Sequence, residues 1–220
     1  MRRPTPHLRL RLHTNDYGDA AVRVGRWVAG LRQQRLAGDW SLDTYHPESG
    51  RYGCGSALAA AERLFAADST AALAQLVAQP ESGIDRQALT ALSMVDLAAS
   101  MLGSLTNGCE WLVARPEQTG QAPIQRDVLR QTVALDPSEL PEPIQRAWKE
   151  RSGAVTRYAA ELSAVAGPLT PASVLPSLMH LHVVRALGPG EDAEQLTCRL
   201  ARHVALAAVR RRVRAVGASR

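Results

Sequence analysis

The chain has 220 residues, of which 45 % are hydrophobic and 21 % are charged, as is ordinary for one globular domain spanning residues 1–220. It has no apolar run of about 18 residues that would span a membrane, and no apolar run follows the charged start as in a signal peptide. Aromatic residues make up only 4 %, so we expect a core of Leu, Val and Ala, which favours helices. The net charge of +5 is almost entirely arginine, because Lys149 is the only lysine.

The first half of the chain mixes two periodicities. Residues 7–13 and 40–45 alternate between apolar and polar side chains, which predicts two strands. Residues 19–37 have helical spacing. Residues 56–67 predict a further helix, and Asp68 with Ser69 is the predicted N-cap of the next one.

The rest of the chain is predicted to be helical. Apolar periodicity favours helices over residues 86–105, 143–166, 172–187 and 191–216, with an exposed proline-rich connection over residues 136–143. Together with the two strands, these helices predict an α+β fold, in which a small β-sheet element carries a predominantly helical body.

Three clusters contain residues suited to chemistry. On the first predicted strand, His7, Arg9, Arg11 and His13 share the face opposite the leucines, which fits either a solvated face or an anion site. A glycine-rich loop over residues 44–54 contains Arg51, which is either solvated or held for binding.

The third cluster lies on the helix predicted over residues 172–187. His180 and His182 would point about 200° apart, so that one faces the interior and the other the solvent. A lone histidine on an apolar helix is commonly a hydrogen-bonded core residue. No histidine follows either one at the fourth position, and Cys54, Cys109 and Cys198 have no metal-binding spacing, so no metal site is predicted.

In order, these clusters resemble the thiopeptide-type bacteriocin biosynthesis proteins, which are similar to the C-terminal elimination domain of lantibiotic dehydratases. The family's His-Leu-Arg-Leu-Arg strand is matched over residues 7–11, and its Tyr-x-Pro-Glu-x-x-Arg-Tyr-Gly-Gly loop over residues 45–54. Residues 62–69 match a Glu-x-Leu-Phe-x-x-Asp-Ser helix junction, and residues 177–188 match a Ser-Leu-x-His-x-His-x-Asn-Arg-x-x-Gly helix. The four motifs cover nearly the whole chain.

This sequence departs from the family pattern at three points. Cys54 replaces the second glycine of the loop, and Val184 replaces the asparagine of the last helix. The family's first strand follows some tens of residues that are similar to sheet strands, whereas here it begins at residue 7. We therefore expect a domain shortened at its N-terminus, with a weakened sheet edge.

The resemblance implies a lyase that eliminates glutamate from glutamylated Ser or Thr side chains of a precursor peptide, leaving dehydroalanine or dehydrobutyrine. It implies that Arg9, Arg11 and Arg51 stabilise developing negative charge and that His180 transfers the proton, as base or as acid. His7, Glu48, Tyr52 and Arg185 are the residues expected to bind substrate.

Two other functions remain open on the sequence. One is a non-catalytic companion that binds the precursor peptide or the glutamylating partner, and the other is a pyridine synthase that closes a ring from two dehydroalanines. No cofactor is expected. The expected partners are the precursor peptide and a glutamyl-tRNA-dependent glutamylating protein, with no membrane and no direct nucleic acid, in the cytoplasm. Although the chain is basic, it has no helix-turn-helix, zinc-finger or RNP signature.

Overall fold

The computed structural model describes residues 8–116 and 123–218, with side chains as far as residue 212. It divides into two compact units, residues 1–47 and 48–220. In the described part of the first unit, residues 8–47, the helix is α1 (Tyr17–Gln33), whose N-terminus is capped by the side chain of Asp16 through the backbone N–H of Asp19. Within this unit the Arg11 guanidinium lies over the Tyr45 ring, 5.6 Å from its centroid.

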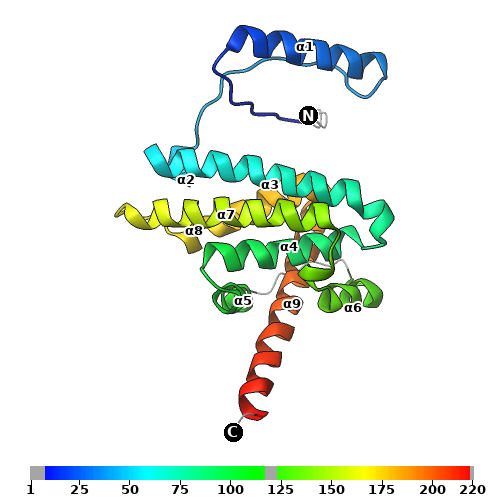
Figure 1. Cartoon of the computed structure of the whole chain (residues 1–220), viewed down its shortest axis with the longest axis vertical. Helices are drawn as coiled ribbons and strands as arrows, with labels where there is room; N and C mark the ends of the chain where they lie inside the picture. Colours follow the sequence, from blue (N-terminus) through cyan, green and yellow to red (C-terminus); the bar gives the residue numbers. More distant parts are fainter. Residues whose placement is uncertain (1–7, 117–122, 219–220) are drawn as a thin grey trace. The chain divides into compact units, whose positions relative to one another are not determined.

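The second unit is helical. Its elements are α2 (Ser49–Tyr52), α3 (Gly55–Ser82), α4 (Arg86–Met101), α5 (Leu105–Ala114), α6 (Arg126–Ala134), the short 3-10 helix η1 (Pro137–Glu139), α7 (Glu142–Ala164), α8 (Pro171–Leu187) and α9 (Glu191–Ala218). Figure 1 shows α3, α7 and α4 running alongside one another, and α4 also packs against α5, α6, α8 and α9. Helix α4 is therefore the central helix of the unit.

The predicted α+β class is wrong, because the described residues contain no strand. Residues 8–13 and 40–45, which alternate as strands do, have no regular secondary structure here. Alternation gives a strand its two faces, but the hydrogen bonds that hold it come from a neighbouring strand. Residue 7, the start of the first predicted strand, lies outside the described residues.

The predicted break at Asp68 is also wrong, because α3 runs through it without interruption to Ser82. Asp68 is 3 % exposed, so its carboxylate belongs to the interior of the unit rather than to a helix end. The helix ends instead at Gly83, whose φ of 66° is the left-handed conformation that glycine adopts without strain. The next helix starts at Asp85, whose side chain accepts hydrogen bonds from the N–H groups of Gln87 and Ala88.

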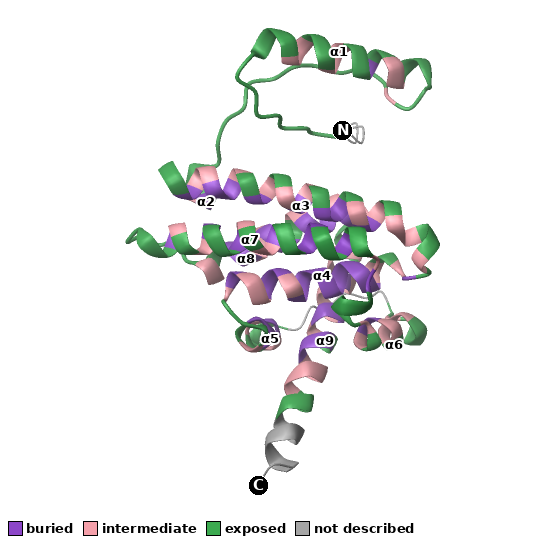
Figure 2. Ribbon diagram, in the orientation of Figure 1, coloured by how far each residue is buried: buried purple, intermediate pink, exposed green. Residues whose placement is uncertain are grey.

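The core is built largely from small and aliphatic side chains, as the composition predicts. Figure 2 shows buried residues along most of α4 and on the inner sides of α3 and α7. The alanines of α3 and α4 let these helices approach their neighbours closely, and Leu, Val and Met fill the spaces between them.

Among the described residues, no single helix is long and apolar enough to cross a membrane. Helices α4 and α5 taken together have the length and composition of a membrane span, but the two helices are bent by 114° relative to each other. That bend brings Gly108 of α5 against the backbone of Ala99 in α4, where an added Cβ would lie 2.6 Å from the Ala99 nitrogen. The crossing of these helices therefore depends on a glycine.

We expect Gly108→Ala to lower the free energy of unfolding by about 1–3 kcal/mol, because the backbone of α4 would have to move to admit the methyl group. Gly153→Ala is the matched control, since Gly153 lies inside α7 with no atom near its Cβ position. The control should be neutral or more stable by about 0.5–1 kcal/mol. Urea unfolding of both variants measures this, and equal stability of the two would contradict the tight crossing.

Candidate functional site

A single buried carboxylate joins three helices of the second unit. Asp68 of α3 contacts His182 Nδ1 through Oδ1 at 2.7 Å and accepts a hydrogen bond from Arg185 NH1 through Oδ2 at 2.7 Å; both partners belong to α8. Arg151 of α7 reaches Oδ1 at 3.3 Å. The interior thus contains an acid bound by two guanidinium groups and an imidazole.

Arg151 extends this network to α4. It is fully buried and donates to the Ser93 hydroxyl at 2.7 Å and to the Asp96 carboxylate at 2.8 Å. The Ser93 hydroxyl in turn accepts a hydrogen bond from Gln75 of α3 at 3.0 Å. The buried polar network therefore draws on α3, α4, α7 and α8, and the two charges of Asp68 and Asp96 offset those of the arginines.

The charge on Asp68 is strongly favoured. Burial alone would raise the pKa of this carboxyl, but the adjacent His182, Arg151 and Arg185 outweigh burial and hold the pKa well below its usual range. Because the pKa is lowered in the folded state, the network stabilises the fold above the pKa of an unfolded aspartate, about 3.9, and this contribution is lost as the pH falls.

Some polar atoms of this interior have no partner among the described residues. These buried atoms are Gln75 Oε1, Trp148 Nε1, Arg151 Nε and His182 Nε2. Each such atom costs free energy, and buried ion networks are seldom more stable than apolar replacements of the same size. The network is therefore better explained by what it holds in place than by a gain in stability.

Arg185 connects the network to the surface residues of α2. Its guanidinium lies over the Phe65 ring, 5.7 Å from the centroid, and Phe65 makes an edge contact with Tyr52 at 4.9 Å. Beside Tyr52, Arg51 pairs with Glu48 at 3.1 Å. Four residues predicted for the site, Glu48, Arg51, Tyr52 and Arg185, are thus brought into one neighbourhood.

Within this group Tyr52 is a core residue. It is 3 % exposed, and its carbonyl oxygen accepts a hydrogen bond from the Tyr158 hydroxyl at 2.9 Å. Burial raises the pKa of the Tyr52 hydroxyl, and the neighbouring Arg51 guanidinium offsets only part of this rise. Tyr52 therefore anchors α2 to α7, and Arg51, whose side chain is 60 % exposed, is the member of this pair that faces solvent.

His180 lies on the solvent side of α8. Its side chain is 54 % exposed, and its Nδ1 lies 2.8 Å from Glu194 Oε2 on α9. His182, two residues further on, is fully buried against Asp68. The prediction that one histidine faces solvent and the other the interior is therefore confirmed.

The remaining predicted residues lie in the first unit. Arg9 and Arg11 are exposed, on a segment without regular structure, and Arg11 contacts Tyr45 as described above. His7 lies outside the described residues. Arg51 and His180, by contrast, lie in the second unit.

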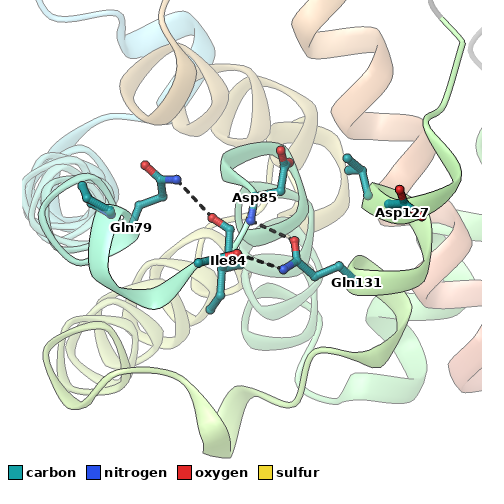
Figure 3. Close-up of a pocket in the computed structure, with 8 residues that line it drawn as sticks. Gln79, Ile84, Asp85, Asp127 and Gln131 are labelled. Carbon is teal, nitrogen blue, oxygen red and sulfur yellow. Dashed lines mark hydrogen bonds between the residues drawn. The ribbon is translucent and has the colours of Figure 1, made fainter.

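A pocket of about 370 Å³ lies elsewhere, where the turn between α3 and α4 meets α6. Figure 3 shows its polar groups bonded to one another: Gln131 accepts from the Asp85 N–H at 2.8 Å, and Gln79 donates to the Ile84 carbonyl at 3.3 Å. None of the predicted site residues lines it. The polar groups that line the pocket are thus paired with one another, and the bond to Gln131 fastens the turn to α6.

Comparison with known proteins agrees with the motifs. The family model for the C-terminal part of lantibiotic biosynthesis dehydratases matches residues 1–205. The chain belongs to this family. Among curated proteins no sequence matches it.

One solved structure with a similar fold is the tRNA-dependent lantibiotic dehydratase MibB from Microbispora sp. 107891. The TM-score is 0.71 at 22 % sequence identity, over 89 % of this chain and 22 % of that one. The likeness at this identity concerns the fold. The chain thus spans about a fifth of the length of that dehydratase.

In this member of the dehydratase C-terminal family, the sequence patterns do not identify several residues of the polar clusters, among them Arg151 and Glu194. Arg151 gives no local signal, because it lies in an ordinary charged stretch of α7 and meets Asp68 only in the folded chain. Glu194 was not singled out either, although it belongs to an acidic first turn with Glu191 and Asp192. That turn, directly after a histidine-containing helix and a Gly-Pro-Gly connection, is the signal that could have indicated it.

We expect Asp68→Asn to lower the free energy of unfolding at neutral pH by about 3–5 kcal/mol, since it removes the negative charge that faces buried Arg151. The unfolding of the variant should also depend less on pH between about pH 5 and 2, because Asp68 no longer takes up a proton on acid unfolding. Denaturant titrations across this range measure both effects.

Asp127→Asn is the control for this comparison. Asp127 is exposed and pairs with Arg130 within α6, so its loss should cost less than about 1 kcal/mol. If Asp68→Asn were as stable as this control, or kept the full acid dependence of the wild type, the buried charge network would not be formed as described.

Proposed function

We propose that this chain acts in lantibiotic- or thiopeptide-type peptide dehydration as a lyase. It removes glutamate from glutamylated Ser or Thr residues of a precursor peptide and leaves dehydroalanine or dehydrobutyrine. Membership of the dehydratase C-terminal family supports the pathway. The presence of Arg9, Arg11, Arg51 and His180 at the motif positions supports the elimination step.

The reaction sets clear demands on the side chains. A base must take the α-proton, and negative charge develops on the amide oxygen of the enolate and on the departing glutamate carboxylate. Guanidinium groups stabilise such oxygens with paired, charge-assisted hydrogen bonds, and an imidazole moves a proton near neutral pH. In this proposal Arg51, Arg9 and Arg11 stabilise the developing negative charges. His180 transfers the proton.

The observation that carries the proposal is solvent access on α8. The helix has two histidines, and the one assigned to proton transfer by resemblance, His180, has a side chain 54 % exposed, whereas His182 is fully buried. A peptide at the surface can reach an exposed imidazole such as that of His180, but not the buried imidazole of His182. Exposure thus favours the same histidine as the motif.

Arg185 has a supporting part in the proposal. Its side chain is 23 % exposed and contacts both Asp68 and the Phe65 ring, so it is already held in place before substrate binds. The exposed remainder of its guanidinium adds positive charge beside Tyr52 and Arg51. This arrangement suits a bound carboxylate such as that of the glutamyl group.

The glutamyl ester has to be supplied by another activity. MibB, of which this chain matches 22 % by length, is named as tRNA-dependent. We propose that a glutamylating protein or region loads the precursor peptide and that this chain acts on the loaded peptide. The partners of this chain are then the precursor peptide and the glutamylating activity.

The proposal predicts that the purified chain converts a chemically glutamylated Ser peptide to the dehydroalanine peptide, followed by mass spectrometry. His180→Ala and Arg51→Ala should each reduce the rate by about 100-fold or more, since positioned proton transfer alone contributes about 10²–10⁴-fold. Arg51→Lys should also be impaired, because an ammonium group lacks the two-pronged geometry of guanidinium.

The controls are His203→Ala and Arg157→Ala, which change an exposed histidine of α9 and an exposed arginine of α7. Both should keep the wild-type rate. An unchanged peptide mass with the folded wild-type chain would overturn the elimination proposal. Binding of the precursor peptide without conversion would then favour the non-catalytic companion.

A further inference from the structure

His180 is paired with an acidic residue that no motif assigns. Glu194 Oε2 lies 2.8 Å from His180 Nδ1, and the two side chains are 33 % and 54 % exposed. We infer that Glu194 is a positioning residue that sets the tautomer of His180 and makes it the base of the elimination. The catalytic part of this inference rests on the proposed function.

The connection between α8 and α9 brings the two residues together. Helix α8 ends at Gly188, whose φ is 86°, and α9 begins at Glu191, so the chain reverses within a few residues. Glu194 lies in the first turn of α9, where its N–H donates to the Gly190 carbonyl at 3.1 Å. A carboxylate in a first turn is favoured by the helix dipole, which helps to hold the Glu194 side chain in place.

The pairing determines which ring nitrogen carries the proton. A carboxylate can only accept a hydrogen bond, so the nitrogen facing it must be the donor. Neutral His180 therefore carries its proton on Nδ1 and has the lone pair on Nε2, the nitrogen on the opposite edge of the ring. The sequence leaves open whether His180 acts as base or acid, and this tautomer suits it to act as the base in the first step.

The step balances as follows. Nε2 of His180 takes the α-proton, and the electrons of that C–H bond form the Cα–Cβ double bond through the enolate. The Cβ–O bond breaks, and its electrons leave with glutamate as the carboxylate. His180, now an imidazolium stabilised by Glu194, returns its new proton to the departing carboxylate or to water.

The pair formed by Asp68 and His182 provides an internal comparison. It has the same contact, Nδ1 to a carboxylate oxygen at 2.7 Å, but its histidine is fully buried and its Nε2 has no partner among the described residues. Both pairs fix a tautomer, yet only His180 presents Nε2 where a peptide can approach. Glu194 thus orients a histidine that a substrate can reach, whereas Asp68 holds helices together in the interior.

The test measures the tautomer directly. Long-range proton–nitrogen correlation spectra of isotope-labelled protein, assigned with His180→Ala, report which ring nitrogen of His180 is protonated. The wild type should have the proton on Nδ1. In Glu194→Ala the side chain should revert to the preference of free histidine, with the proton mostly on Nε2.

Kinetics on the glutamylated Ser peptide form the second measurement. Glu194→Ala should lose roughly 10-fold in kcat with KM changed less than about twofold, a part of what positioned proton transfer supplies. Glu194→Gln should keep the tautomer, because its amide oxygen still accepts from Nδ1, and should have an intermediate kcat because the imidazolium loses its charged partner. Glu191→Ala is the matched control, since Glu191 lies in the same first turn and contacts Gln195.

The outcomes separate this inference from the proposed function. An unchanged His180 tautomer in Glu194→Ala overturns the inference, whatever the chain does to the peptide. A changed tautomer with an unchanged kcat overturns the catalytic role of Glu194. If the tautomer changes in Glu194→Ala while the wild-type chain never releases glutamate, the positioning by Glu194 is supported and elimination as the function is overturned.

Discussion

The charge of Asp68 is the constraint on which the second unit depends. A carboxylate in the interior is tolerable only with partners in good geometry, and these come from α7 and α8, while Arg151 carries the constraint on to α4. Apolar packing alone allows helices to slide and rotate at small cost. Directed contacts to one carboxylate remove that freedom. Arg185 also contacts Phe65, which packs against α2, so the network is linked to α2.

Helix α8 presents its two histidines to opposite surroundings. The spacing of His180 and His182 puts one imidazole against Asp68 and the other against Glu194, so two similar pairs have opposite surroundings. The buried pair fixes the rotation of α8 about its axis. The exposed pair is then presented toward α9, and Arg51 of α2 is held independently through its neighbour Tyr52, which bonds to Tyr158.

Sequence patterns predicted much of the helical part and little of how its parts meet. The helices near residues 143–166, 172–187 and 191–216 were predicted closely because apolar periodicity and proline or glycine boundaries are local signals. The strands were wrong because alternation does not supply a pairing partner. The sequence predicts an N-cap at Asp68 because Asp and Ser are favoured at the start of a helix. Its partners lie 83 to 117 residues away, and no local pattern encodes them.

The buried network also restricts how this chain can change over evolution. Losing Asp68 alone would strand Arg151 in the interior, and losing Arg151 alone would leave Asp68 and Asp96 with fewer donors. Apolar residues at all of these positions together could be as stable as the network, but every single step toward that state is costly. We therefore expect related sequences either to retain the set whole or to have replaced it whole.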